Sequence, residues 1–548
     1  MKWNNLLLAL VVLFIGSSFA PPTVSEKLPR PKLVVGIMVD QMRWDYLYRY
    51  YERYGSDGFK RLLNEGFSNE NTYIDYIPTV TGIGHSTVYT GSVPAIHGIT
   101  GNSITFNSTG ESVNCVGDAN VNSVGTSTDE GKKSPVNLLV NTIGDELKLA
   151  SNFRSKVIGI SFKDRGAILP AGHAGDAAYW FEGKSGKWIT STYYMDQLPK
   201  WVDAFNDRNY AKKYLNMDWN TLYDVDTYIQ STADDKPYEG IIQGQTTAVF
   251  PIKTSKFYTK DDYSALGSTP YGNSMILDFA KETIAKEKMG MRGETDLLAV
   301  SLSSTDAIGH RFGINSVEVE DTYLRLDRDI AKFLEYLDKE IGKGNYTIFL
   351  TADHGGSHNP QFLHENKLPV HTVKSPIKDD LNNLLKQKFQ VDGLVTGLGY
   401  NQVRFDYKLI DAHQLQEQEI RDLCVQYLKR NPEVLFVADF NRIGDASIPE
   451  ELKGRMINGH HSERSGGIAF IFNSDAKSLT AKGSGHSDWN PDDAKIPLLW
   501  MGWGIKKGGR SVGQAHMSDI APTVATLLRI QPPNGSIGNV LSEVLMEQ

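Results

Sequence analysis

Short, continuous runs of Val, Ile, Leu and Phe recur along this 548-residue chain, separated by longer polar stretches. Apolar runs of this length without polar alternation are typical of strands that are buried on both faces of a sheet. They predict strands at residues 33–39, 156–162, 297–303, 346–352, 467–472 and 496–502.

Helical periodicity occupies several of the intervening stretches. Residues 317–342 place apolar side chains at three- and four-residue intervals and charged side chains elsewhere, which predicts an amphipathic surface helix. Residues 518–530 predict another helix, with Ser518 as its N-terminal cap. Strands that alternate with helices indicate an α/β fold with a mostly parallel sheet.

Candidate functional side chains directly follow the predicted strands. In parallel α/β sheets, ligands bind at the carboxyl ends of the strands. We therefore expect one site to contain the residues that follow the first four strands, namely Asp40, Lys163, Arg165, Asp306, His310, Asp353 and His354.

Residues that resemble parts of one site recur from Asp40 to His486, which predicts a single catalytic domain over residues 27–548. Stretches at about 170–275 and 365–465 interrupt the pattern and are interpreted as insertions over or beside the site; the second includes a helix-like segment around 411–431. Aromatic residues of the first insertion either line a substrate mouth or pack in the core: Tyr179, Trp180 and Trp188.

Residues 1–20 combine Lys2, an apolar run from Leu6 to Ile15 and the small residues Ser18 and Ala20, which predicts a secretory signal peptide. The mature chain would start near Pro21 and be periplasmic or secreted. The apolar run is shorter than the roughly 20 residues of a membrane span, so we expect no stable membrane insertion.

The net charge of -8 and the pI near 5.9 argue against a general binder of nucleic acid or anionic membranes. Positive charge for binding phosphate must therefore be local, from metals or a few side chains. Cys115 and Cys424 either form a disulfide or remain buried free thiols, and neither alternative supplies a cysteine zinc site.

Asp and His side chains are suitable zinc ligands, and a catalytic zinc commonly takes three protein ligands and leaves one position open. The chain offers two such sets. The first is Asp306, His310 and His486, and the second is Asp40, Asp353 and His354, with Thr81 at the open position. Each of these residues alone is more often a helix cap or a hydrogen-bonded structural residue, so the prediction rests on the joint pattern.

Residues 77–102 are rich in Gly, Thr and Ser, as expected where backbone approaches a small anion. Thr79, Thr81 and Ser86 are candidate nucleophiles, because a nearby base or metal can activate a hydroxyl. Lys163 and Arg165, two residues apart, would point the same way in an extended segment. Taken alone, they are ordinary surface charges.

These motifs together resemble the alkaline phosphatase superfamily, close to its nucleotide pyrophosphatase/phosphodiesterase branch and closer to the phosphate-irrepressible periplasmic alkaline phosphatases. The resemblance runs from Asp40 to about residue 530. It implies a three-layer sandwich with a mostly parallel central sheet and large insertions. It also implies two zinc ions held by Asp40, Thr81, Asp306, His310, Asp353, His354 and His486.

The resemblance further selects Thr81, four residues before a His in TGIGH, as the nucleophile, with Thr79 as the alternative. It assigns Asn102 to a non-bridging phosphate oxygen, although Gly-Asn is also a common turn. The pair Lys163 and Arg165 matches the monoesterases of the superfamily, whereas its diesterases generally lack the pair.

The implied function is hydrolysis of small-molecule phosphate monoesters, with broad specificity, through a phospho-threonine intermediate in a monomeric enzyme. The alternative is a phosphodiesterase or nucleotide pyrophosphatase with the same metals. A sulfatase is disfavoured because no C/S-x-P-x-R motif is found, and a phosphoglycerate mutase because of the signal peptide. A non-catalytic phosphate-binding module is disfavoured because every expected ligand and the nucleophile are present.

Overall fold

The computed structural model describes residues 28–242, 245–256, 262–370, 375–473 and 479–546. The predicted signal peptide lies outside the described residues. Residues 31–548 form one compact unit. Among the described residues, no helix has both the length and the apolar character that a membrane crossing needs.

A ten-stranded mixed sheet forms the centre of this unit, in the order β18-β2-β17-β11-β1-β10-β7-β8-β9-β6. Its middle is parallel as predicted, and Leu33 pairs with both Asp296 and Tyr346. Antiparallel pairs extend the sheet on both sides. The strands are β1 Leu33–Val39, β2 Phe67–Asn69, β6 Ser123–Val124, β7 Val157–Ser161, β8 Ala177–Glu182, β9 Lys187–Ser191, β10 Asp296–Leu302, β11 Tyr346–Thr351, β17 Leu498–Gly502 and β18 Gly509–Ser511.

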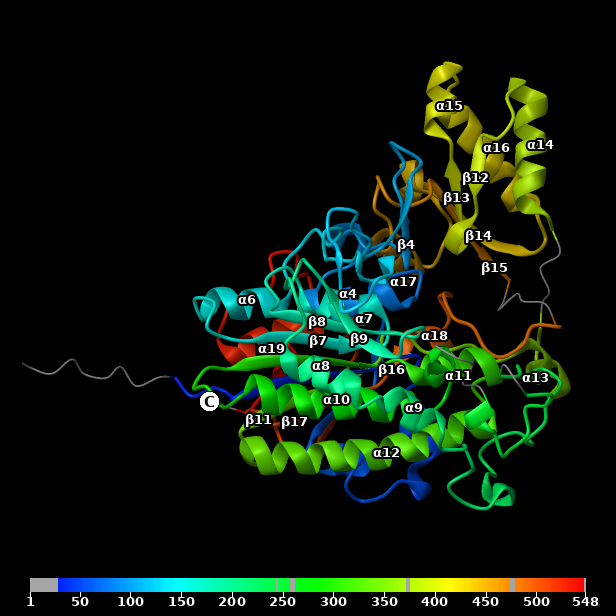
Figure 1. Ribbon diagram of the computed structural model, residues 1–548. Coiled ribbons are helices and arrows are strands. Elements are labelled where there is room, and N and C mark those ends of the chain that lie inside the picture. Colours follow the sequence, from blue (N-terminus) through cyan, green and yellow to red (C-terminus); the bar gives the residue numbers. More distant parts are fainter. Residues whose placement is uncertain (1–27, 243–244, 257–261, 371–374, 474–478, 547–548) are drawn as a thin grey trace, which may run out of the picture. The chain divides into compact units, whose positions relative to one another are not determined.

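Helices cover both sides of this sheet, as Figure 1 shows for α4 and α7 on one side and α10 and α12 on the other. Every residue of β1, β10 and β11 is buried, and their apolar side chains belong to the main core. The main helices are α2 Tyr46–Arg49, α3 Phe59–Glu65, α4 Thr81–Thr90, α5 Pro94–His97, α6 Ile143–Ala150, α7 Asp164–Ala171, α8 Lys200–Asp207, α9 Tyr210–Leu215, α10 Tyr271–Glu287, α11 Ser304–Phe312, α12 Val317–Leu337, α13 Pro360–Glu365, α18 Pro491–Ala494 and α19 Ile520–Leu528.

Two predicted helices form with small differences at their ends. The 317–342 prediction corresponds to α12 and a terminal π-helical turn, Asp338–Gly342. The 518–530 prediction corresponds to α19, but Ser518 is not its cap. A 3₁₀ turn precedes the helix, and the Ser518 hydroxyl donates to Asp75 Oδ2 at 2.8 Å instead.

Residues 365–465 contain most of a second, smaller core. Its four-stranded sheet has the order β12-β13-β15-β14 and contains the predicted strand at 467–472, which is therefore not part of the central sheet. Cys424 lies in this core and Cys115 in the main one, and both are buried free thiols. The elements are β12 Val395–Gly397, β13 Gln402–Phe405, β14 Val434–Asp439, β15 Ile468–Phe472, α14 Ile377–Phe389, α15 Tyr407–Ala412, α16 Glu417–Arg430 and α17 Glu450–Asn458.

Within the stretch at 170–275, β8 and β9 continue the central sheet. Tyr179, Trp180 and Trp188 are at most 3% exposed, so they pack in the core and do not line a substrate mouth. Small sheets complete the fold: β3 Thr72–Tyr73 with β16 Lys495–Ile496 and β19 Ala515–His516, and β4 Ser103–Thr105 with β5 Ser112–Asn114.

Candidate metal and phosphate site

The central parallel strands deliver the predicted residues to one edge of the sheet. Thr81 is the first residue of α4, and His486 lies in the segment before α18. The residues that follow β1, β7, β10 and β11 are, in that order, Asp40, Lys163, Asp306 in the first turn of α11, and Asp353 with His354.

The first predicted ligand set is assembled by α11 and the 479–490 segment. The ligand atoms of Asp306, His310 and His486 all lie within 4.8 Å of one another. His310 Nε2 is 3.1 Å from Asp306 Oδ1, and His486 Nε2 is 3.9 Å from the same oxygen. The His310 side chain is 42% exposed and the Asp306 side chain 7%, so this set opens towards solvent.

The second predicted ligand set is more deeply buried than the first. Asp40, Asp353 and His354 are fully buried. His354 Nε2 lies 3.6 Å from Asp40 Oδ1 and 3.5 Å from Asp353 Oδ2. Asp306 also lies within 4.8 Å of the Asp40 and His354 ligand atoms, so its carboxylate borders both sets. The rings of His354 and His486 stack with centroids 3.6 Å apart, which makes the two sets adjacent.

The three histidines are oriented as metal ligands usually are. A ligating histidine commonly donates its second ring N–H to a carbonyl or carboxylate, which fixes the tautomer. His310, His354 and His486 each direct Nδ1 at a backbone carbonyl, those of Ser484, Gly355 and Thr79, at 2.8, 2.8 and 2.7 Å. Each Nε2 therefore keeps its lone pair towards the site.

Two buried carboxylate oxygens also fit a bound cation. Asp40 Oδ1 and Asp353 Oδ2 have no hydrogen-bond partner among the described residues. Burial, and then the Asp40 charge, raise the pKa of Asp353 well above its usual range. Because a buried charge without a partner is costly, these oxygens favour positive charge beside them. The residues present therefore fit a metal centre.

Lys163 places a positive charge beside the carboxylates of Asp40 and Asp306. Its Nζ lies 2.6 Å from Asp40 Oδ2 and 2.6 Å from Asp306 Oδ2. Burial lowers the pKa of Lys163, but Asp306 and Asp40 outweigh it and raise that pKa above its usual value. The ammonium thus contacts a carboxylate from each ligand set.

The three candidate nucleophiles differ in what their hydroxyls contact. Thr81 Oγ1 lies 3.5 Å from His354 Nε2 and 3.4 Å from Lys163 Nζ. Thr79 Oγ1 donates to the Asp488 carbonyl at 3.0 Å, and Ser86 Oγ donates to the Gly82 carbonyl at 2.8 Å. Of the three hydroxyls, that of Thr81 is the one directed at the ligand sets.

The N-terminus of α4 lies beside the site at Thr81. All ten residues of α4 are buried, and the positive end of the helix dipole favours an anion beside its first turn. Gly84 permits close packing here, since a Cβ would lie 2.4 Å from the Asp353 carbonyl oxygen. Gly82 N donates to Asn102 Oδ1 at 2.8 Å, which leaves the Asn102 NH2 group as a donor for an anion.

Lys163 and Arg165 would point the same way in an extended segment, but they do not lie in one. Lys163 is the N-cap of α7 and Arg165 lies in its first turn, because the chain turns into a helix directly after β7. Arg165 Nη1 lies 3.6 Å from Asp164 Oδ1, and its buried Nε has no hydrogen-bond partner among the residues described.

Two contacting residues were not predicted from sequence. Gln41, with φ of 63°, donates from Nε2 to Asp306 Oδ1 at 2.9 Å and from its backbone N–H to Asp353 Oδ1 at 3.2 Å. In the sequence, its position directly after Asp40 could have indicated this role. Tyr400, in the β12–β13 connection, accepts from Asn102 N at 3.2 Å, and nothing local in the sequence indicates that contact.

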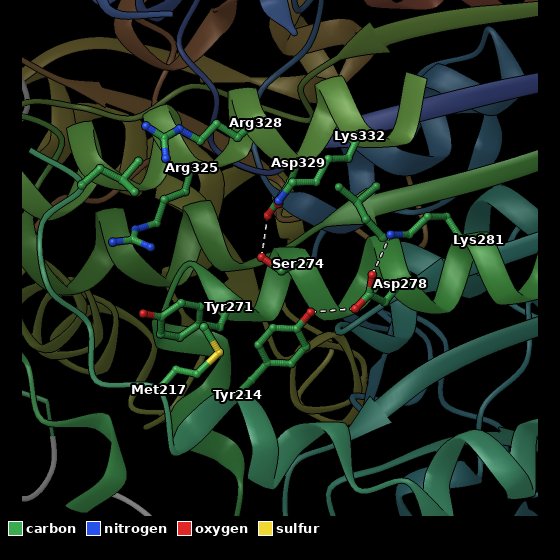
Figure 2. Close-up of a pocket in the computed structure, with 12 residues that line it drawn as sticks. Tyr214, Met217, Tyr271, Ser274, Asp278, Lys281, Arg325, Arg328, Asp329 and Lys332 are labelled. Carbon is green, nitrogen blue, oxygen red and sulfur yellow. Dashed lines mark hydrogen bonds and ion pairs between the residues drawn. The ribbon is translucent and has the colours of Figure 1, made fainter. Parts of the chain in front are cut away.

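A separate cavity of about 260 Å³ lies between α9, α10 and α12 (Figure 2). It contains none of the predicted site residues. Some of its polar groups pair with one another, with Lys281 Nζ 2.7 Å from Asp278 Oδ1 and Tyr214 OH donating to Asp278 Oδ2 at 2.6 Å.

The family model described as type I phosphodiesterase / nucleotide pyrophosphatase matches residues 34–491. A protein of Myroides odoratus described as a calcium-transporting ATPase is 53% identical over 526 residues, which cover 95% of this chain and 96% of the relative. Alkaline phosphatase PhoV of Synechococcus elongatus is 50% identical over 553 residues, which cover 100% of both chains. The crystal structure of wild-type alkaline phosphatase PafA matches with a TM-score of 0.91 and 47% identity, over 95% of this chain and 100% of that one.

Proposed function

The chain belongs to the type I phosphodiesterase / nucleotide pyrophosphatase family, and on this premise we propose that it is an alkaline phosphatase, which releases inorganic phosphate from phosphate monoesters. Two relatives support this activity: PhoV matches over the whole length, and the PafA structure has the same fold.

We further propose that the site holds two zinc ions, one on Asp306, His310 and His486 and one on Asp40, Asp353, His354 and Thr81. Asp and His ligands with open positions are typical of catalytic zinc. Bound zinc would stabilise charge on phosphoryl oxygens and lower the pKa of a hydroxyl or water. The assignment rests on the position of the Thr81 hydroxyl. Thr81 begins α4, and its Oγ1 lies beside His354 Nε2 and Lys163 Nζ.

The reaction proceeds by two displacements at phosphorus. Thr81 Oγ loses its proton to solvent and forms a bond to phosphorus as the ester bond breaks, and the departing alkoxide takes a proton from solvent on the open His310 side. Water then attacks the phospho-threonine, which releases phosphate and restores the hydroxyl. The fully buried His354, Asp40 and Asp353 exclude solvent from the nucleophile side.

Asn102, Lys163 and Arg165 bind the non-bridging oxygens during both steps. A monoester dianion has three such oxygens and two charges, whereas a diester has one charge and a substituent on one oxygen. Two cationic side chains therefore favour monoesters. The alternative is a phosphodiesterase, the activity that the family description names. The name of the Myroides relative suggests ATP as a further substrate. Its terminal phosphate has three non-bridging oxygens, as a monoester has, and therefore falls within the proposed substrate range.

The remaining proposals concern processing and assembly. The protein is exported through its predicted signal peptide, residues 1–20, and acts as a monomer in the periplasm or outside the cell. N-terminal sequencing of the exported protein would show cleavage before Pro21. Light scattering after size-exclusion chromatography would give the mass of one chain.

The test of the function compares kcat/KM for a phosphate monoester and a diester with the same leaving group. We expect a higher value for the monoester, complete loss after chelation, and recovery with two equivalents of zinc. A preference for the diester would support the alternative. Full activity in metal-free protein would refute the metal assignment.

A further inference from the structure

The smaller core contacts the part of the chain that carries Asn102. Residues 98–109, here called the Asn102 segment, follow α5 and run through β4 into the turn before β5. Hydrogen bonds join this segment to residues of the smaller core on both sides of Asn102. They run from Arg464 Nη1 to the Gly98 carbonyl at 2.7 Å, from Thr100 Oγ1 to the Arg464 carbonyl at 3.1 Å, from Arg404 Nη1 to the Thr105 carbonyl at 3.3 Å and from Lys408 Nζ to the Thr109 carbonyl at 2.8 Å.

Tyr400 makes the contact at Asn102 itself. Its hydroxyl oxygen accepts from Asn102 N at 3.2 Å. A Cβ on Gly101 would lie 2.5 Å from Tyr400 Cε2, so the ring lies directly on the backbone before Asn102. Tyr400 belongs to the β12–β13 connection of the smaller core, but its ring packs against the main core. This side chain therefore joins the two cores at the Asn102 segment.

The backbone of Tyr400 has an unfavourable conformation. Its φ of 55° and ψ of 39° lie in the left-handed region, and Asn401 follows with φ of 56°. Bulky residues rarely adopt this conformation, which persists only where the surrounding structure offsets its cost. The contacts of Tyr400 with Gly101 and Asn102 are interactions that can offset it.

Asn102 is held at three of its own groups. Its N–H donates to Tyr400, its carbonyl accepts from Cys115 N at 3.0 Å, and its Oδ1 accepts from Gly82 N at 2.8 Å. Gly82 directly follows Thr81, the proposed nucleophile. The three contacts together fix the position of the Asn102 NH2 group beside the first turn of α4. A small displacement of such a group can slow a reaction substantially, because catalysis depends on its orientation.

We propose that Tyr400 is a positioning residue for phosphate binding. Its hydroxyl holds the backbone of Asn102 so that the Asn102 NH2 group meets a non-bridging oxygen of the substrate. This inference rests on the proposed phosphatase function and on the proposed role of Asn102. Without the hydroxyl, the Asn102 N–H loses its acceptor and the backbone is free to shift. The smaller core thus contributes to phosphate binding, although its residues include none of the proposed metal ligands.

The experiment is a double-mutant cycle on the full-length mature protein loaded with zinc. It compares wild type, Tyr400→Phe, Asn102→Ala and the double variant in kcat/KM for a phosphate monoester and in Ki for inorganic phosphate. Tyr400→Phe should lower kcat/KM and raise Ki by about tenfold each, because it removes a single hydrogen-bond partner. Zinc content should stay unchanged. In the Asn102→Ala background, Tyr400→Phe should have almost no further effect, since both changes act through the same contact.

The matched control is Tyr427→Phe, which removes a hydroxyl that donates to Asp380 elsewhere in the smaller core. It should match wild type in kcat/KM and Ki. A loss equal to that of Tyr400→Phe would reveal a general effect of the smaller core and overturn the proposal.

Further outcomes would also overturn it. An unchanged kcat/KM in Tyr400→Phe would show that the hydroxyl is dispensable. An equal loss from Tyr400→Phe with and without the Asn102 side chain would show a structural role that does not act through Asn102. Failure of the proposed function is distinguishable, because wild type itself would then prefer the diester. The same cycle would in that case be measured on the diester, with the same expected pattern.

Discussion

At the start of α4, three hydroxyl residues that look alike in sequence have different surroundings. Thr79 and Ser86 donate to backbone carbonyls, at 3.0 and 2.8 Å, whereas Thr81 Oγ1 faces His354 and Lys163. A hydroxyl that is already donating to a carbonyl must break that bond before it can attack. The proposed nucleophile, Thr81, is therefore distinguished from its neighbours by its position in the first turn of the helix.

The first prediction is that Thr81→Ala lowers kcat/KM by at least about a thousandfold with metal content unchanged, because it removes the attacking oxygen and no strong ligand. Thr81→Ser should keep much of the rate because the hydroxyl remains. Peptide fragmentation by mass spectrometry after acid quench should find phosphate on residue 81. Ser86→Ala is the control and should remain active; phosphate on Thr79 or Ser86 would contradict the assignment.

The second prediction concerns Lys163 and Arg165. A hydrogen bond to a charged group contributes roughly 1.5–3 kcal/mol, so Lys163→Ala and Arg165→Ala should each slow monoester hydrolysis by about ten- to a hundredfold. Both contacts act on one phosphoryl group, so their losses need not add in the double variant. The diester rate should fall much less. Equal losses in kcat/KM on both substrates would show that the two side chains bind any phosphoryl group and do not favour monoesters.

At the scale of elements, the sequence predicted the strands that end at the site and the residues that follow them. Residues 33–39 form β1 as predicted, because a fully apolar run has one stable place, the middle of a covered sheet. Short edge strands such as β6, two residues long, carried no such pattern. The strand at 467–472 was predicted, but its sheet was not, since apolar composition does not specify the partner strand.

Long-range contacts in the site were the part that could not be predicted. The Tyr400 hydroxyl meets Asn102 N across 298 positions, and Asp306 borders both ligand sets because α11 approaches Asp40. The orientation of Lys163 and Arg165 depends on local structure, since α7 begins directly at Asp164 and the segment is not extended. Such features depend on the tertiary packing of α7 and α11.

The third prediction tests how α11 positions the metal ligands. A Cβ on Gly309 would lie 1.9 Å from Gln41 Oε1, so Gly309→Ala must displace the amide that donates to Asp306 Oδ1. Loss of a partner that orients a ligand lowers metal affinity by about ten- to a hundredfold. Competition with a chelator at equilibrium measures this affinity. Gly454→Ala in α17, where a Cβ meets nothing within 4 Å, is the matched control; equal affinities in the two variants would contradict the role of Gln41.

At the scale of the whole molecule, the central strands of the main core end at a cluster of buried carboxylates. Asp40 and Asp353 are fully buried and adjacent to His354; Lys163 contacts Asp40, so without a bound metal the Asp353 carboxyl group has no Lys or Arg partner among the described residues. The smaller core around α14 and α16 contains no Trp, since residues 375–473 have none. Tryptophan fluorescence therefore reports the unfolding of the main core.

The fourth prediction is that Asp353→Asn raises the Tm of the metal-free protein and lowers the Tm of the zinc-loaded protein. Asp353 Oδ1 accepts from Gln41 N at 3.2 Å and His354 N at 3.0 Å, and an amide oxygen can replace it there. The amide NH2 would then replace Oδ2, the buried oxygen without a partner, and one of two adjacent negative charges would be gone. In metal-free protein, Asp353→Asn should therefore raise the Tm by a few degrees. In zinc-loaded protein it should lower the Tm, because a ligand is lost and ligand binding stabilises the folded state. Thermal melts by tryptophan fluorescence check both signs. Asp392→Asn, at the surface beside Lys386, is the control that should change neither. A Tm below wild type in both states would mean that Asp353 has a structural role independent of metal, because relief of buried negative charge would then contribute nothing to stability.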